Sequence, residues 1–369
     1  MGKIAFVRVF SSHPILVSVE DMLKRSFPDY ELETNTITEL LKKRPDLLAF
    51  NSLDVMRVYY REILKNPRTF TRRFLRTPFM FQQVRRLVRH HIERNRGEYS
   101  FSFQLQSLFD ASTPGLPHFI YTDHTYQESQ RYEYRNAPYS TTWLKLEKGI
   151  YQNADRIFTR SSNISNSLII DYGIPQSKVV CAYTGSNILK KDGSGDEHDY
   201  SKKNILFVGI DWERKGGPAL LEAFRIVLNT VPDAQLNIIG PDVQVDLPNC
   251  RVLGQIPIEQ LDQYYRQASI FCLPTRREPF GIVFIEALQY ALPIVATGVG
   301  ALPDFVKVGE NGYLVEPEDV PALAYALIDL LQDEEKRRRF GRNSHILWKE
   351  RYNWENVGAI IRREILEVV

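Results

Sequence analysis

Short apolar runs alternate with amphipathic stretches along most of this chain, and that alternation restricts it to folds built from βα units. In the first half, the expected strands are Lys3–Val9, Tyr99–Gln106, His118–Thr122, Arg156–Thr159 and Val179–Tyr183. In the second half, they are the runs ILFVG, QLNIIG, IFCLP, PIVAT and YLV. Helical patterns lie between these runs, so the sequence predicts an α/β fold with parallel, doubly wound sheets.

The length of 369 residues favours two domains. Between Ile188 and Asn204 the apolar pattern gives way to glycine, serine and charge, and a new strand follows at once, so we place the linker there. We expect one Rossmann-like domain over residues 1–190 and a second over residues 191–352, facing each other across a cleft. Residues 353–369 have apolar positions close to helical spacing and are expected to pack back on the first domain.

The composition is that of an ordinary globular protein, with 43% hydrophobic and 25% charged residues and a net charge of +2. No window of about 18 apolar residues occurs, and Arg8 interrupts the N-terminal apolar run, so we expect a cytoplasmic protein. Cys181, Cys250 and Cys272 are far apart and lack a CxxC pattern. We therefore expect buried, reduced thiols and no metal site.

The stretch EPFGIVFIE places two carboxylates, Glu278 and Glu286, on either side of a Pro-Phe-Gly turn and an apolar helix start. The turn follows an expected strand, and the first amides of the helix have no partners within it, so an anion such as phosphate fits there. Gly281 allows the backbone to approach a ligand closely. A carboxylate can accept two hydrogen bonds from a diol, so this pattern suits a nucleotide sugar.

A second loop, FVGIDWERKGG, supplies positive charge through Arg214 and Lys215. These side chains can hold a diphosphate and stabilise the charge that develops as it leaves. A solvated basic turn is the other interpretation of this loop taken alone. The presence of EPFGIVFIE downstream favours the binding role.

The run EPFGIVFIEALQYALPIVATGVGALPDFVKVGENGYLVEPED resembles the signature of the retaining glycosyltransferases of family 4, and FVGIDWERKGG resembles their diphosphate loop. The resemblance extends from about Asn153 to Asp319 and implies a GT-B fold with an acceptor-side first domain and a donor-binding second domain. It implies that Glu278 contacts the donor sugar and Glu286 the ribose. The remaining implied donor contacts are Gly209, Arg214, Lys215, Phe280, Gly281 and Ile282.

His124, in YTDHTY, stands where this family carries an active-site histidine near the transferred sugar, although a lone histidine is more often structural. The sequence departs from the family pattern at three places. Ile210 replaces the usual arginine after the glycine of the diphosphate loop, and we expect Arg214 to substitute for it. Ala291 replaces a glycine at a helix end, and FSSHPILVSVED lacks the usual glycine pair of the acceptor-side loop.

The resemblance also implies a mechanism. Retaining transfer in this family is thought to proceed on one face of the sugar, with the departing phosphate oxygen taking the acceptor's proton. The protein then contributes positioning and electrostatics, and the sequence shows no convincing nucleophile at the donor motif. We expect no cofactor and no metal, because cationic side chains and helix N-termini can hold the diphosphate.

Residues 57–96 carry twelve lysines and arginines against two glutamates, with apolar residues such as Phe70, Phe74, Met80 and Phe81 interleaved. Such a segment can make peripheral contact with an anionic membrane at its inner face, bind a phosphate-bearing acceptor, or be a solvated face over a core. No nucleic-acid-binding motif accompanies the charge, so nucleic acid is not an expected partner.

The sequence therefore predicts a hexosyltransferase-type enzyme that moves a sugar from a nucleotide-diphosphate-sugar to a hydroxyl of a glycan, a lipid-linked acceptor or a small molecule. The alternative from another class is a catalytically silent GT-B chain that binds nucleotide sugar or acts as a scaffold. A glucan phosphorylase is disfavoured because no pyridoxal-phosphate lysine motif is present, and a Rossmann dehydrogenase because GxGxxG does not follow the first strand.

Overall fold

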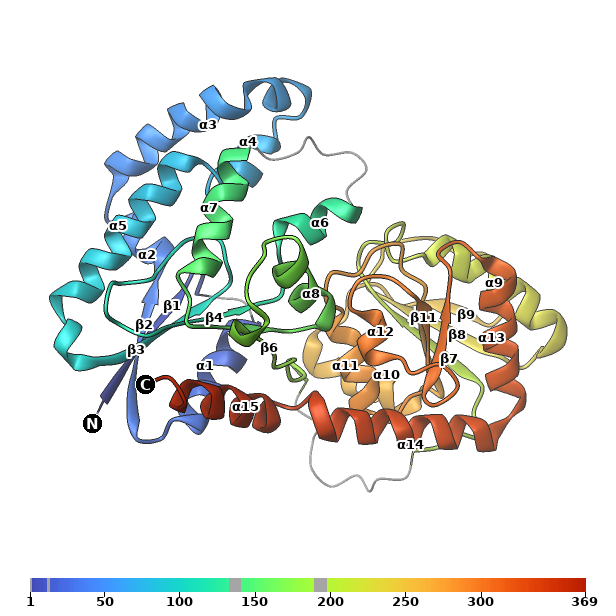
Figure 1. The fold of residues 1–369 in the computed structure, drawn as a ribbon. Coiled ribbons are helices and arrows are strands. Elements are labelled where there is room, and N and C mark those ends of the chain that lie inside the picture. The colour runs from blue at the N-terminus through green and yellow to red at the C-terminus, as the bar shows by residue number, and fades with distance from the viewer. Residues whose placement is uncertain (1, 12–13, 133–140, 189–197) are drawn as a thin grey trace. The chain divides into compact units, whose positions relative to one another are not determined.

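The computed structural model describes residues 2–11, 14–132, 141–188 and 198–369, which form two compact units. Figure 1 shows both. The first unit comprises Met1–Tyr183 together with Val357–Val369, and the second comprises Thr184–Asn356. The expected boundary after residue 190 and most of the expected linker lie outside the described residues. The chain passes between the units at residues 183 and 184, and returns at residues 356 and 357.

The first unit contains a six-stranded parallel sheet in the order β2-β1-β3-β4-β5-β6. Its strands are β1 (Gly2–Arg8), β2 (Tyr30–Thr36), β3 (Tyr99–Leu105), β4 (His118–Thr122), β5 (Arg156–Thr159) and β6 (Val179–Cys181). Its helices are α1 (Pro14–Ser26), α2 (Ile37–Lys42), α3 (Pro45–Lys65), α4 (Thr69–Arg73), α5 (Pro78–Arg94), α6 (Tyr126–Tyr132), α7 (Thr141–Gln152) and α8 (Ser162–Ile170).

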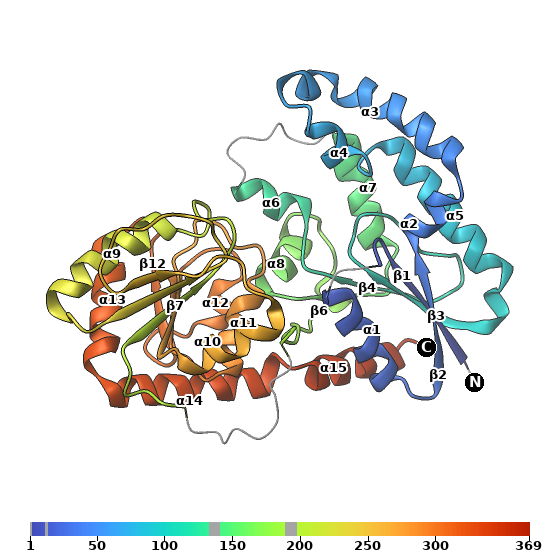
Figure 2. The ribbon, with the colours of Figure 1, turned by 180° about the vertical axis from the view of Figure 1, so that it is seen from behind.

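Successive residues of each strand face opposite sides of this sheet, so both sides need a cover. Ala5 and Val7 belong to a core that includes residues of α5 and α7. Phe6 faces the other side and packs against Phe103, with ring centroids 6.3 Å apart. Figures 1 and 2 show α5 and α7 on one face of the sheet and α1 on the other.

The C-terminal helix α15 (Trp354–Leu366) supplies further cover for the first unit, to which its residues from Val357 onward belong. Val357, Ile361 and Ile365 are fully buried. Arg362 donates a hydrogen bond from Nη1 to the carbonyl oxygen of Ser26, at 2.6 Å. The apolar spacing seen in the sequence is therefore that of a helix with one buried face.

The second unit contains another six-stranded parallel sheet, in the order β12-β11-β10-β7-β8-β9. Its strands are β7 (Asn204–Val208), β8 (Gln235–Ile239), β9 (Cys250–Val252), β10 (Ile270–Leu273), β11 (Ile294–Thr297) and β12 (Gly312–Val315). Its helices are α9 (Gly217–Thr230), α10 (Leu261–Gln267), α11 (Ile282–Gln289), α12 (Leu302–Phe305), α13 (Val320–Gln332) and α14 (Glu334–Arg351). Helices α9 and α13 cover one face, and α10 and α11 the other (Figure 1). The expected α/β class with two doubly wound parallel sheets is confirmed.

The basic segment 57–96 spans the end of α3, all of α4 and α5, and the start of the following turn. The apolar residues interleaved in this segment include Met80 and Phe81. These two are core residues with 0% and 1% exposure, so they cannot lie on a lipid-facing surface. Arg73 is also buried, and its Nη2 lies 3.4 Å from Oε2 of Glu62. The positive charge and these apolar side chains thus do not share one surface.

The three cysteines are free thiols, as expected, but only Cys272 is buried. Cys181 and Cys250 are partly exposed, which corrects the expectation for these two. Burial raises the pKa of the Cys250 thiol to about 11. No helix among the described residues is both long enough and apolar enough to cross a bilayer.

Candidate functional site

Three neighbouring strands of the second unit, β11, β10 and β7, end at the same edge of the sheet. The loops that follow them carry most of the candidate residues, because the carboxyl ends of parallel strands meet at one edge. Backbone contacts hold the loops after β7 and β10 together. The carbonyl oxygen of Arg214 accepts hydrogen bonds from the amide of Arg276 (2.9 Å) and from Oγ1 of Thr275 (3.0 Å).

Lys215 and Glu278, which are 63 residues apart in the chain, form an ion pair and hydrogen bond between Nζ and Oε2. Their side chains are only 12% and 7% exposed, so solvent screens the pair weakly. Gly216, the next residue, has φ of +75°, and a Cβ there would lie 1.9 Å from the carbonyl oxygen of Pro274. The loops after β7 and β10 can therefore approach this closely only because position 216 is glycine.

Gly209 directly follows β7 at the base of the same loop, and a Cβ there would lie 3.0 Å from Cγ of Lys215. Arg214 extends across the loop after β10, where its Nη1 donates to the carbonyl oxygen of Arg277 at 3.0 Å. Its Nε also donates to Oδ2 of Asp211 at 3.0 Å. Ile210, the departure from the family pattern, is 70% exposed and so contributes no packing that would explain its presence.

The Pro-Phe-Gly turn places Gly281 at the N-cap of α11 with φ of +88°, and no side chain caps this helix end. Ile282 is the first helical residue, and its amide belongs to the group with no partner inside the helix. The ring of Phe280 packs edge-on against Phe305 at a centroid distance of 6.1 Å. The turn therefore presents backbone amides next to Glu278, whose Cγ would lie 3.1 Å from a Cβ at position 281.

Glu286 lies within α11 and is 3% exposed. Its Oε2 accepts a hydrogen bond from the hydroxyl of Tyr265 on α10 at 2.8 Å. Burial raises the pKa of the Glu286 carboxyl to about 7, and the bond from Tyr265 opposes this rise only in part. The ring of Tyr265 is stacked on that of Tyr290 at 5.3 Å, which fixes the position of the hydroxyl.

His124 follows β4 in the first unit, and its Nε2 lies 2.6 Å from Oγ of Ser129. The backbone of His124 is held by the hydroxyl of Tyr151, which lies 3.3 Å from its carbonyl oxygen and 3.2 Å from Oε1 of Glu147. Glu147 is 3% exposed and also accepts from the amide of Tyr126 at 3.0 Å. Burial raises the pKa of its carboxyl to about 7.

The structure thus brings together Gly209, Arg214, Lys215, Glu278 and the turn around Gly281 in the second unit, and it places Glu286 one helical turn further into α11. His124 belongs to the first unit. Sequence reasoning missed two residues. Tyr265 holds Glu286, and Glu147 holds the His124 loop through Tyr151. A tyrosine or glutamate within an amphipathic helix gives no signal of such a role.

Sequence reasoning also missed Gly300, in the loop after β11. It has φ of +56°, and a Cβ there would lie 2.0 Å from the carbonyl oxygen of Glu278. This glycine lets the loop pass against the backbone of the Glu278 turn. Among the residues that the structure describes, no group of three or more histidine, cysteine, aspartate or glutamate side chains could hold a metal ion.

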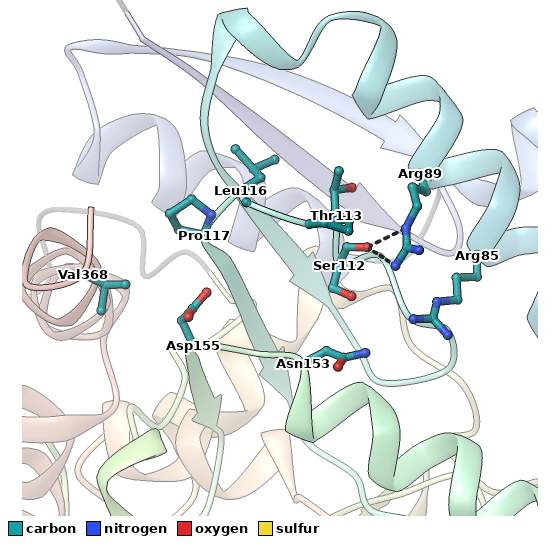
Figure 3. A pocket seen from close by; sticks show the side chains of 11 residues that line it. Arg85, Arg89, Ser112, Thr113, Leu116, Pro117, Asn153, Asp155 and Val368 are labelled. Atoms are coloured by element: carbon teal, nitrogen blue, oxygen red, sulfur yellow. Dashed lines mark hydrogen bonds between the residues drawn. The ribbon is translucent and has the colours of Figure 1, made fainter.

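A pocket of about 640 Å³ in the first unit lies near the amino ends of β4 and β5, away from the strand end that carries His124. Figure 3 shows Arg85 and Arg89 on one side of it and Asp155 and Val368 on the other. Arg89 donates from Nε and Nη2 to the carbonyl oxygen of Ser112, at 3.3 and 3.1 Å. Asp155 accepts from the amide of His118 at 2.8 Å. The residues that line this pocket belong to the first unit, whereas the candidate donor residues belong to the second.

Comparison with solved structures identifies the fold. HepE of Anabaena in complex with UDP superposes with a TM-score of 0.67 over 100% of both chains at 14% sequence identity. A sucrose-phosphate synthase from Thermosynechococcus elongatus gives a TM-score of 0.66 at 17% identity, over 100% of this chain and 99% of that one. The two doubly wound units therefore form a GT-B fold, as expected.

Two family models match the sequence. Residues 40–188 match "Glycosyltransferase Family 4", and residues 194–346 match "Glycosyl transferases group 1". Most of the first match falls in the first unit, and the second match falls within the second unit. This chain belongs to glycosyltransferase family 4.

Curated relatives match over part of their length. A D-inositol 3-phosphate glycosyltransferase from Corynebacterium kroppenstedtii is 29% identical over 226 residues, which are 54% of this chain and 50% of that protein. A phosphatidyl-myo-inositol mannosyltransferase from Mycobacterium leprae is 34% identical over 171 residues, 44% of this chain and 46% of that one. The chain thus spans about half the length of the curated relatives that it matches.

Proposed function

We propose that this protein is a retaining glycosyltransferase that moves a sugar from a nucleotide-diphosphate-sugar donor to an acceptor hydroxyl. The observation that carries the proposal is the contact between Lys215 and Glu278 beside the uncapped N-terminus of α11. A fold without a ligand there has little use for two nearly buried, opposite charges at a strand end. UDP in HepE, which has the same fold, supports a nucleotide donor.

In this proposal the donor lies along the carboxyl ends of β7 and β10. Glu286 accepts hydrogen bonds from the ribose diol, and Tyr265 fixes the orientation of its carboxylate. The amides at the start of α11 and the cations Lys215 and Arg214 hold the diphosphate. Glu278 contacts hydroxyls of the donor sugar. Because the ammonium group of Lys215 is bonded to Glu278 in this structure, a bound diphosphate competes with Glu278 for it.

Transfer with retention requires the acceptor hydroxyl and the leaving phosphate on one face of the sugar. The departing phosphate oxygen then takes the acceptor's proton, and no protein nucleophile forms a bond to the sugar. Lys215 and the amides of the Gly281 turn stabilise the charge that develops on the diphosphate. His124 acts near the transferred sugar, held by its backbone bond to Tyr151.

The same cations and amides do the work that a metal ion performs at other diphosphate sites, so we propose that transfer needs neither a metal nor a cofactor. Full activity after dialysis against EDTA is the expected result. Activity that is lost in EDTA and restored by Mg²⁺ or Mn²⁺ would contradict this part of the proposal.

The acceptor is a glycan, a lipid-linked molecule or a small molecule that offers a hydroxyl. We further propose a cytoplasmic protein that contacts the inner face of an anionic membrane through the basic segment 57–96. The curated relatives that act on inositol phosphate and on phosphatidyl-myo-inositol are consistent with a phosphate-bearing acceptor.

The first test is a thermal-shift panel of nucleotide diphosphates and nucleotide sugars against the wild type and Glu286→Ala. Stabilisation by one donor that is lost in the variant supports the site and identifies the base. Hydrolysis of that donor without acceptor then separates an enzyme from the alternative, a catalytically silent nucleotide-sugar-binding or scaffold protein. A donor that binds but is never hydrolysed or transferred would favour the silent chain.

A further inference from the structure

Helix α3 in the first unit has one face fixed to the protein. Leu47, Asn51, Val55 and Tyr59 repeat every fourth residue and are buried. The amide of Asn51 donates to the carbonyl oxygen of Phe74 at 2.5 Å, and the hydroxyl of Tyr59 donates to that of Arg76 at 2.6 Å. The helix is therefore held in a defined orientation by polar bonds as well as by packing.

The opposite face of α3 is apolar and exposed. Phe50 and Leu53 lie three residues apart before a kink at Tyr59, where φ is −118° and ψ is 16°, and Tyr60 and Leu64 lie four residues apart after it, so each pair shares one side of its own helical segment. Their side chains are 61%, 70%, 47% and 79% exposed, and Met56 beside them is 46% exposed. A helix with apolar residues on both sides is normally enclosed, whereas this one is the outermost helix over its side of the sheet (Figures 1 and 2).

Positive charge borders this face. Residues 42–72 contain eight lysines and arginines against three acidic residues, a net charge of +5 on a chain whose total is +2. Arg57 lies between the exposed apolar residues; its side chain is 79% exposed, and its Nη2 forms an ion pair with Oδ1 of Asp54 at 2.7 Å. Arg61 lies over the ring of Tyr60 at 5.7 Å, so the stripe and its cations are parts of one surface.

We propose that the outward face of α3 is a docking surface for an anionic lipid bilayer, an inference that rests on the membrane contact proposed above and places it on this helix. The two segments of α3 on either side of its kink lie along the bilayer surface, with Phe50, Leu53 and Leu64 entering the interface and Arg57 and Arg61 at the phosphate level. A second copy of this chain does not suit the surface, because pairing it with itself brings like charges together. The docking face is the α3 stripe and does not include the core residues Met80 and Phe81.

The experiment is co-sedimentation of the full chain with vesicles of phosphatidylcholine alone and with about 30 mol% phosphatidylglycerol. Wild type should bind the anionic vesicles and release them as salt rises from about 0.1 M to about 0.5 M. Leu53→Ser with Leu64→Ser should weaken this binding by about tenfold or more, and Arg57→Gln with Arg61→Gln by a similar factor.

Two matched controls keep the test specific. Ile170→Ser removes an apolar side chain that is 75% exposed on α8 in the same unit, and Lys24→Gln with Arg25→Gln removes two exposed cations of α1, outside segment 57–96. Both should bind within about twofold of the wild type. No preference for anionic vesicles, or equal losses in the controls and the α3 variants, would overturn the proposal.

A second measurement does not depend on affinity. A tryptophan introduced as Leu64→Trp should be quenched by brominated acyl chains in anionic vesicles, whereas Ile170→Trp should not. Quenching of neither tryptophan would refute insertion of α3. The thermal shift of each variant by UDP reports the second unit, so failure of docking and failure of the donor site remain distinguishable.

Discussion

Replacement of Glu286 by glutamine should stabilise the protein at alkaline pH while weakening donor binding. The carboxyl is buried, and its pKa is about 7 in the folded protein against 4.5 for the free side chain. The stability that protonated Glu286 contributes is fully present below pH 4.5, and it is lost as pH rises through 7. The difference between the folded and unfolded pKa values corresponds to a loss of roughly 3 kcal/mol of stability above pH 7. The uncharged amide of Glu286→Gln avoids this loss.

The assay is thermal unfolding at about pH 5 and about pH 8, with and without a nucleotide sugar. At the higher pH the melting temperature of the variant should exceed that of the wild type by about 6–12 °C, and at the lower pH by no more than about 3 °C. The affinity for the donor should fall by about 1.5–3 kcal/mol, the cost of losing charge-assisted hydrogen bonds to the ribose.

Glu222→Gln, at an exposed position on α9, is the matched control and should change neither quantity. The reasoning fails if Glu286→Gln melts at the same temperature as the wild type at both pH values, because the folded carboxyl would then cost nothing to ionise. If the variant binds donor as tightly as the wild type, the ribose role is wrong although the burial argument stands.

Three further predictions concern single residues. Lys215→Ala should slow transfer by about a hundredfold or more in steady-state assays, and an unchanged kcat would exclude a role at the leaving group. Ala291→Gly should raise stability to urea by about 0.5–1 kcal/mol, since Ala291 has φ of +55° and glycine relieves that strain; a less stable variant would contradict this. Glu147→Gln should leave UDP binding unchanged. It should reduce the loss of stability between about pH 5 and about pH 8, because burial raises the pKa of the Glu147 carboxyl. The same dependence of stability on pH in variant and wild type would refute this prediction.

The strands buried on both faces could be predicted from the sequence. His118–Thr122 and Arg156–Thr159 were predicted with the bounds that the structure gives to β4 and β5. The edge strands β2 and β9 were missed. Strand β2 has the sequence YELETNT and is half exposed, so it shows no apolar run, and β9 is only three residues long.

The candidate site was predictable where it is local. Glu278, the turn around Gly281, the helix start and Glu286 lie within nine residues of sequence, shortly after the strand that ends at Leu273. The departure at Ala291 was also visible, and the structure adds that the residue adopts the left-handed conformation that glycine favours.

The sequence by itself thus determined which segments form buried strands and which loops follow them, because burial on both faces selects continuous apolar runs and a helix start selects its turn residues. Only the tertiary structure decided that Lys215 meets Glu278 and that Tyr265 holds Glu286. Only it decided that α3 keeps an apolar face outward. The two contacts depend on strand order, and the exposed face of α3 depends on which helix lies outermost. Strand order and helix position both arise from contacts between residues far apart in the chain.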